Sequence, residues 1–252
     1  MRKVVWKRDA IHNGNLVVVN AGYPFREGKN RGNLVAVNRQ ERHVLLDSRA
    51  AGMLAGLMEG LGGWEQIAAV SGWRSMREQQ EIYAGSLKEN GADYTRRFVA
   101  LPNHSEHQTG LAIDLGARQG RIDFICPEFP CTGICREFRK RAASFGFVER
   151  YPEGKEHVTG IAHEPWHFRY VGTPHAEIMD RHGMVLEEYM DFLKQYPYGK
   201  ECYCYRTQER DIWVSYLRAE KEGDTCLELE EGAVYSASGN NMDGYIITVW
   251  NP

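Results

Sequence analysis

The chain has 252 residues, of which 42% are hydrophobic and 26% are charged, as in an ordinary globular protein. Its formal net charge is −3 at pH 7 and no basic stripe runs along it, which argues against a nucleic-acid partner. No apolar run approaches the ~20 residues that span a bilayer, and no apolar segment follows the basic N-terminus as in a secretory signal, so the sequence predicts a cytoplasmic protein without a membrane span.

The first part of the chain contains two predicted strands and two predicted helices. An apolar run at 16–20 predicts a strand that leads into a turn-rich loop, and 67–73 predicts a buried strand. Apolar residues at helical spacing predict a helix over 47–63, and a serine cap followed by good helix formers predicts another over 75–91. Glycines end both helices.

The second part begins with a strand at 111–116, which is apolar enough to be central in a sheet. Within 132–147 a helix is predicted that is capped by Thr132 and ends at Gly146. The segment 166–172 alternates, which predicts a strand with its aromatic residues on one face and with His167 and Arg169 on the other. One or two helices follow this strand.

The composition changes at 196–199, where tyrosine, proline and glycine predict a loop. We therefore expect a catalytic domain over 1–197 and a small β-rich extension over 198–252 that carries no visible catalytic chemistry. Helices and strands are mixed without regular alternation, so the predicted fold class is α+β, an antiparallel sheet with flanking helices.

Six cysteines occur, and their spacings do not match those of zinc ribbons or fingers. Without an export signal, reduced thiols are expected rather than three disulfides. The six are Cys126, Cys131, Cys135, Cys202, Cys204 and Cys226.

Two polar segments carry the chemistry. The segment 105–116 holds His107 and Asp114, and the segment 163–172 holds His167. A catalytic zinc needs three protein ligands and one open position, and two imidazoles with one carboxylate meet that need. Asp114 lies within an apolar strand pattern, where a carboxylate is costly unless it is paired or bound to a metal. The sequence therefore predicts that these three residues bind Zn²⁺.

Glu164 is the predicted general base. It precedes His167 by three residues, across Pro165, which restricts the chain to an extended or turn geometry. We expect this geometry to place its carboxylate near the metal without making it a ligand, as a general base requires.

These segments also resemble a known family. The sequences SEHQTGLAID and EPWH, with SGWRSMREQQEIY upstream, are similar to the signatures of zinc D-Ala-D-Ala peptidases, the VanX, VanY and VanXY group. The resemblance runs over roughly 15–195, and the appendage makes the chain most similar to the VanXY type. It implies the fold of hedgehog signalling domains, a zinc ion, and hydrolysis of D-Ala-D-Ala or of muramyl-pentapeptide precursors, which lowers the vancomycin target.

The same resemblance implies further site residues. Arg74 is expected to stabilise the oxyanion, since a planar guanidinium donates two hydrogen bonds to a developing tetrahedral oxygen. Ser105 and Gln79 are candidates for holding the substrate's terminal carboxylate. Tyr83, one helical turn after Gln79, is expected to line the same wall.

Substrate scope and oligomeric state stay open at the level of sequence. We expect activity on both the dipeptide and the pentapeptide, with an acid in one of the loops 20–33 and 117–133 recognising the dipeptide amine. The available loop acids are Glu27, Asp123 and Glu128. The alternatives are a phage-type or wall-remodelling endopeptidase of the same fold, a non-catalytic zinc-binding module, and a regulatory protein whose C-terminal part binds a partner.

Overall fold

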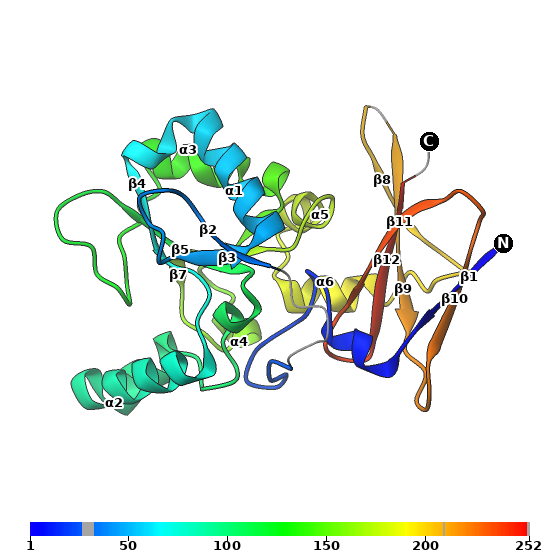
Figure 1. The fold of residues 1–252 in the computed structure, drawn as a ribbon, viewed down its shortest axis with the longest axis horizontal. Helices are drawn as coiled ribbons and strands as arrows, with labels where there is room; N and C mark the ends of the chain where they lie inside the picture. The colour runs from blue at the N-terminus through cyan, green and yellow to red at the C-terminus, as the bar shows by residue number, and fades with distance from the viewer. Residues whose placement is uncertain (27–32, 209, 251–252) are drawn as a thin grey trace. The chain divides into compact units, whose positions relative to one another are not determined.

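The computed structural model describes residues 1–26, 33–208 and 210–250 (Figure 1). Every pairing between named strands is antiparallel, and the helices are interspersed with the strands, which confirms the α+β prediction. No described helix is both long and apolar enough to cross a membrane.

In the described residues the α-helices are α1 (Ser48–Leu61), α2 (Met76–Phe98), α3 (Gly133–Ala142), α4 (Glu156–Thr159), α5 (His175–His182) and α6 (Leu186–Leu193). Short 3-10 helices are η1 (Arg8–His12), η2 (Gly63–Glu65), η3 (Glu106–Thr109) and η4 (Ala143–Phe145). The strands are β1 (Arg2–Trp6), β2 (Leu34–Ala36), β3 (Leu45–Asp47), β4 (Ile67–Ser71), β5 (Ala112–Ala117), β6 (Phe147–Tyr151), β7 (Glu164–Tyr170), β8 (Tyr203–Arg206), β9 (Asp211–Arg218), β10 (Thr225–Leu229), β11 (Val234–Gly239) and β12 (Gly244–Trp250).

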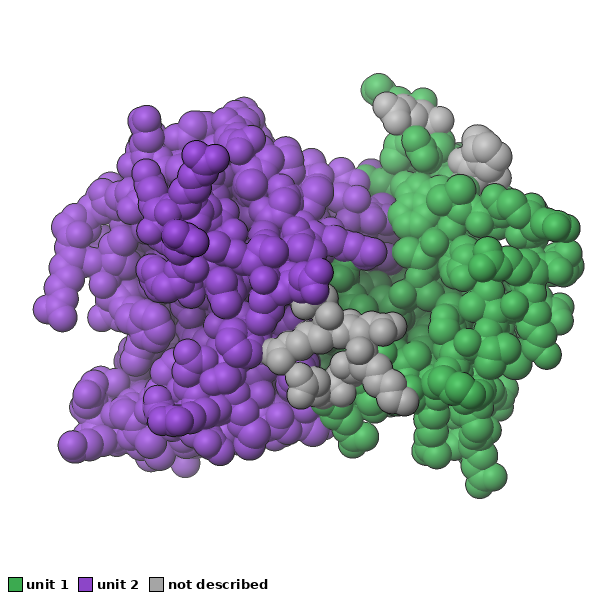
Figure 2. Space-filling view, in the orientation of Figure 1, with its two compact units in different colours: residues 1–18, 26–31, 186–252 green, residues 19–25, 32–185 purple. Residues whose placement is uncertain are grey.

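The chain divides into two compact units (Figure 2). Unit 1 comprises Met1–Val18, Arg26–Arg31 and Leu186–Pro252, and unit 2 comprises Val19–Phe25 and Gly32–Val185. These units do not coincide with the predicted domains 1–197 and 198–252, because α6 and β1 contact the C-terminal strands. Which part of the chain constitutes the catalytic domain stays a prediction.

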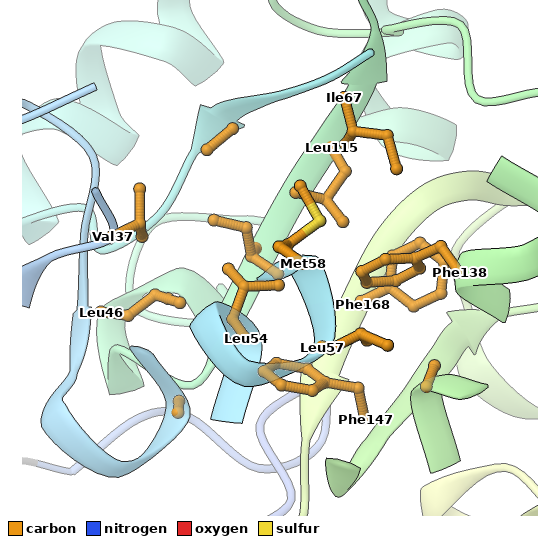
Figure 3. Close-up of a cluster of buried hydrophobic side chains, with 14 of the residues drawn as sticks. Val37, Leu46, Leu54, Leu57, Met58, Ile67, Leu115, Phe138, Phe147 and Phe168 are labelled. Atoms are coloured by element: carbon orange, nitrogen blue, oxygen red, sulfur yellow. The ribbon is translucent and has the colours of Figure 1, made fainter. Parts of the chain in front are cut away.

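Unit 2 is built on a four-stranded sheet in the order β4-β5-β7-β6. Strand β5 lies inside this sheet, and all six of its residues are buried. Helices α1 and α3 contact each other over the core (Figure 3), where Met58 and Leu57 of α1 lie with Phe138 of α3 and with Leu115 and Phe168 of the sheet. Burying each of these side chains contributes about 1.5–3 kcal/mol, so this core fixes the sheet that carries the polar residues described below.

The two long helices begin as predicted, with capping residues. Asp47 accepts the Arg49 amide at the start of α1, and Gly62 ends that helix with φ 61°. Ser75 and Glu78 form a capping box at the start of α2. The predicted end of the first helical segment at Gly91 is confirmed, because Gly91 leaves helical geometry at φ 81°. A second helical segment, which was not predicted, continues from there to Phe98.

The strand predicted over 16–20 is absent. Residues 16–19 are buried but form no strand, because the Leu16 amide bonds to the Ser238 hydroxyl and the Val18 amide to the Asn240 carbonyl rather than to a neighbouring strand. The helix predicted from Thr132 to Gly146 is confirmed as α3 followed by η4, and Gly146 at φ 82° turns the chain into strand β6. Sequence periodicity missed β6 because its burial is nearly continuous rather than alternating.

Unit 1 contains a sheet in the order β11-β12-β9-β8 and a separate pair of strands, β1 and β10. A small core gathers Leu227, Leu229, Tyr245 and Ile247. All six cysteines of the chain are free, as predicted from the sequence.

Candidate active site

Three elements of unit 2 bring the predicted metal ligands together. His107 lies on η3, Asp114 on β5 and His167 on β7. Asp114 and His167 are direct cross-strand partners, and Gly110 at φ 75° ends η3 so that the chain turns into β5. All three side chains are buried, so the site is withdrawn from bulk water.

The donor atoms of these residues converge. Nε2 of His107 lies 3.1 Å from Oδ2 of Asp114, and Nδ1 of His167 lies 3.0 Å from Oδ1 of the same carboxylate. One ligand atom from each residue lies within 4.8 Å of the others, and the two imidazole rings meet edge-on. Bonds of about 2.0–2.1 Å in a tetrahedron separate ligands by about 3.3 Å, so the donor spacing fits a zinc ion.

The carboxylate of Asp114 carries the clearest sign that the residues fit a cation. Oδ1 of Asp114 is buried and accepts no hydrogen bond, although His167 Nδ1 is 3.0 Å away. A buried polar atom without a partner costs about 1–3 kcal/mol. Two lone pairs that point towards one place explain this arrangement, and two imidazoles with one carboxylate are a donor set that suits Zn²⁺.

A hydrogen bond on the other side of the His107 ring also supports a metal site. Its Nδ1 lies 2.6 Å from the Gly72 carbonyl oxygen, which can only accept. Nδ1 therefore carries the proton, and the lone pair is left on Nε2, which faces Asp114.

Glu164 lies at the first position of β7 and is 6% exposed. Its Oε2 is 3.6 Å from His167 Nδ1, beside the converging donors but outside hydrogen-bond distance. Burial raises the pKa of Glu164 to about 8, and His167 and Arg74 offset only part of that effect. A carboxyl with a pKa near neutrality can both take up and release a proton, as acid–base catalysis requires.

The pKa of Asp114, the carboxylate among the predicted metal ligands, shifts in the opposite direction. Burial alone would raise the pKa of Asp114, but His107 and His167 outweigh it and lower that pKa well below its ordinary value. Asp114 is therefore ionised, while its neighbour Glu164 favours the proton. When their surroundings push the pKa values of two neighbouring carboxyl groups apart, the ionised group can bind a cation and the other can transfer protons.

Arg74 enters the site from the segment after β4. Its Nη2 donates to Asp114 Oδ2 over 2.8 Å, and its Nε donates to the Ser71 hydroxyl over 2.8 Å. These bonds hold the guanidinium at the pocket wall. Its role at an oxyanion stays a prediction.

The pocket brings together most of the predicted substrate residues. Ser105 and Gln79 are buried and line it, and Ile82 rather than Tyr83 lies on the wall. Gln79 donates from Nε2 to the Ala100 carbonyl, and its buried Oε1 has no partner. Gln79 therefore offers an acceptor, which suits a substrate N–H group better than the carboxylate predicted for it.

The loop acids do not form a carboxylate wall in the described structure. Asp123 accepts the amides of Ile125 and Cys126 and so stabilises its own turn. Glu128 is exposed and does not line the pocket, where Phe124 and Ile125 lie instead. Glu27 lies outside the described residues.

Sequence reasoning missed the buried charges behind the ligands. Glu106, next to His107, pairs with Arg150 and Arg169, and each of these three side chains is fully buried. The predicted alternation of β7 placed Arg169 on the face of His167, which was the available signal. The partner strand β6, which carries Arg150, was not predicted.

The chain is similar in sequence to proteins of known activity. Residues 49–173 match the family model described as VanY, D-alanyl-D-alanine carboxypeptidase. The bifunctional D-Ala-D-Ala dipeptidase and D-Ala-D-Ala carboxypeptidase VanXYC of Enterococcus gallinarum is 41% identical over 181 residues, which cover 71% of this chain and 95% of that protein.

Two solved structures extend the likeness to three dimensions. The vancomycin resistance D,D-dipeptidase VanXYg, solved with a D-Ala-D-Ala phosphinate analogue, superposes with a TM-score of 0.96 at 45% identity and covers 99% of both chains. A mutant of the vancomycin resistance D,D-pentapeptidase VanY, solved with Zn(II), superposes with a TM-score of 0.56 at 28% identity and covers 70% of this chain and 98% of that one.

Proposed function

The chain belongs to the VanY family of D-alanyl-D-alanine carboxypeptidases, and from this premise we propose that it is a zinc D,D-peptidase acting on D-Ala-D-Ala. Its substrates are the free dipeptide, the muramyl-pentapeptide precursor, or both. The observation that carries the proposal is the convergence of His107, Asp114 and His167 beside a buried Glu164. Loss of D-Ala-D-Ala termini removes the target of vancomycin, and the predicted cytoplasmic location is where the soluble precursors are made.

His107 through Nε2, His167 through Nδ1 and Asp114 would hold the zinc ion. When bound, zinc supplies Lewis-acid polarisation and lowers the pKa of water. The ligand set has one negative charge, so the site keeps a net positive charge that favours an electron-rich carbonyl.

Glu164 is the proposed proton carrier. It takes a proton from the attacking water and passes it to the leaving D-Ala amine. Burial favours the protonated form of Glu164, which lowers the free-energy cost of protonating the bound state and so suits the second transfer. Arg74 lines the same pocket and donates to the oxygen that gains charge at the carbonyl.

Substrate binding involves other residues of the pocket that the metal ligands line. Ser105 can donate its hydroxyl to the terminal carboxylate, and Gln79 can accept from a substrate N–H group through Oε1. A neutral amide acceptor suits both an ammonium and an amide N–H. The Gln79 side chain is therefore compatible with the dipeptide and with the longer precursor, which supports the proposal of dual activity.

The test is a paired release assay for D-Ala from the dipeptide and from the muramyl-pentapeptide precursor, with polymerised cell wall as the third substrate. We expect zinc-dependent release from one or both soluble substrates. Activity confined to polymerised wall would support the endopeptidase alternative, and a zinc-loaded protein inactive on all three substrates would support the non-catalytic alternative.

A further inference from the structure

Glu106 occupies an unusual position for a carboxylate. It lies on η3 directly before His107, and its side chain is fully buried. Its Oε1 accepts from Nε of Arg150 on β6 and from Nη1 of Arg169 on β7, each over 2.8 Å. One oxygen of the carboxylate is thus committed to two buried guanidinium groups.

The other oxygen faces a metal ligand. Oε2 of Glu106 lies 3.5 Å from Nε2 of His167, on the side of the ring opposite Asp114. Both atoms are buried, and neither has another hydrogen-bond partner in the described part of the chain. Glu106 Oε2 and His167 Nε2 are therefore positioned to form a hydrogen bond with each other.

The chemistry of this contact determines where His167 carries its proton. An ionised carboxylate only accepts hydrogen bonds, so the ring nitrogen that faces it must be protonated. A proton on Nε2 leaves the lone pair of the neutral ring on Nδ1, the atom that converges with Asp114 and His107. Carboxylates commonly orient metal-binding histidines in this way.

We propose that Glu106 is a positioning residue that fixes the ring orientation and the Nε2–H tautomer of His167, so that Nδ1 is presented to the metal. This inference rests on the metal-binding part of the proposed function and not on its substrate. Arg150 and Arg169 act as a clamp that holds Glu106 in place from two strands. The clamp also fixes η3, so a single carboxylate sets the geometry of both imidazole ligands.

The competing explanation is that these contacts only hold η3 on the sheet. Glu106→Gln separates the two, because it keeps the size of the side chain. Glutamine has one acceptor oxygen, which the two arginines occupy, and its amide N–H then faces His167 Nε2. That contact favours the opposite tautomer, with the proton on the atom that should bind the metal.

The matched control is Glu41→Gln. Glu41 is also buried in unit 2, pairs with Arg118 and accepts from Asn38, and does not line the pocket. Both changes remove one buried negative charge, so both are expected to lower the melting temperature. Only Glu106→Gln is expected to alter metal binding.

Two measurements test the proposal. Chelator competition should show the zinc Kd of Glu106→Gln raised about 10–100-fold, the range for loss of an outer partner of a metal ligand, with Glu41→Gln unchanged. In ¹H–¹⁵N spectra of the metal-free protein, recorded at a pH high enough for the His167 ring to be neutral, the protected His167 Nε2–H proton should be present in the wild type and in Glu41→Gln, and lost in Glu106→Gln.

Unchanged zinc affinity and an unchanged His167 Nε2–H proton in Glu106→Gln would overturn the proposal. If Glu106→Gln does not fold, Glu106→Asp, which keeps the charge but shortens the side chain, should still weaken zinc binding; wild-type affinity in that variant would also overturn it. A wild-type protein that binds no zinc would refute the proposed metal, whereas the spectra of the metal-free protein would still decide the role of Glu106.

Discussion

At the scale of single residues, Asp114 and Glu164 show how position changes the chemistry of a carboxylate. Asp114 has both histidines and Arg74 around it and stays ionised. Glu164 has no bonded cation within hydrogen-bond distance among the described residues, and burial raises its pKa to about 8. Two similar groups thus acquire separate tasks through their neighbours.

Glu164→Gln should retain zinc and lose about 10²–10⁴-fold in kcat, the range for removal of a general base. Steady-state D-Ala release and zinc content by atomic absorption measure the two quantities. Glu149→Gln is the control, since Glu149 is a half-buried carboxylate on β6 that pairs with Arg139 away from the pocket. A zinc-loaded Glu164→Gln with near-normal turnover would place the base elsewhere.

Above about pH 6.5, where histidines of the unfolded chain are neutral, the metal-free protein should lose stability as pH rises. Burial raises the pKa of Glu164 to about 8; burial lowers that of His167, but Asp114, Glu106 and Glu164 raise it to about 9. Both values exceed those of the unfolded chain, about 4.3 and 6.5. The folded state therefore binds extra protons, and their contribution is complete below the unfolded values and lost through about pH 8 and 9.

Thermal melts from pH 7 to pH 9 in chelator measure this loss, whose slope is at most about 1.4 kcal/mol per pH unit for each group. Glu164→Gln should flatten the slope between pH 7 and 8. With zinc bound the trend should weaken or reverse, because protons compete with the metal. A metal-free melting temperature that rises steadily up to pH 9 would contradict the assigned shifts.

At the scale of elements, the register of the sheet makes the site. Strand β5 pairs with β7 so that Asp114 opposes His167, and β4 pairs with β5 so that Ser71 opposes Asp114. A shift by one residue would turn every one of these side chains to the other face. Gly72, directly after β4, then brings its carbonyl to His107.

Gly72→Ala should weaken both the fold and the metal site. A Cβ at this position would lie 2.2 Å from the Leu45 carbonyl oxygen, so the backbone that holds His107 must move. We expect a loss of about 1–3 kcal/mol in the free energy of unfolding, measured in urea, and weaker zinc binding by chelator competition.

Gly85→Ala is the control for that change. A Cβ there meets nothing within 4 Å, and the position lies inside α2. It should stabilise the protein by about 0.5–1 kcal/mol without affecting zinc. Equal effects of the two substitutions would mean that the close approach at Gly72 is unimportant.

Local signals in the sequence predicted the long elements but not their assembly. Capping residues located the starts of α1 and α2, and alternation located the faces of β7. The contacts of Glu106 with Arg150 and Arg169 depend on how η3 packs on β6 and β7, and no local pattern encodes that packing. The cluster of Glu106, Arg150 and Arg169 could not be predicted, because Arg150 lies on β6 and that strand was not predicted.

At the scale of the whole molecule, the cysteines form no covalent link between any parts of the chain. Thiol titration without reductant should therefore find six reactive groups after denaturation. In the native protein the exposed Cys131, Cys202 and Cys226 should react first, and the buried Cys135 should react only after the protein unfolds. Fewer than six thiols in freshly purified, denatured protein would reveal a disulfide.

The pairing of β1 with β10 has a consequence for biosynthesis. Arg2 pairs with Leu229, so at ~5–20 residues per second the ribosome completes the second strand roughly 10–45 s after the first. Unit 2 is translated entirely in this interval and can fold while Val4 and Trp6 still lack their partners. An unpaired apolar strand is a template for aggregation. Truncated translation products that end before Leu229 should therefore aggregate and be bound by chaperones more than the full chain, although they lack only a short part of it.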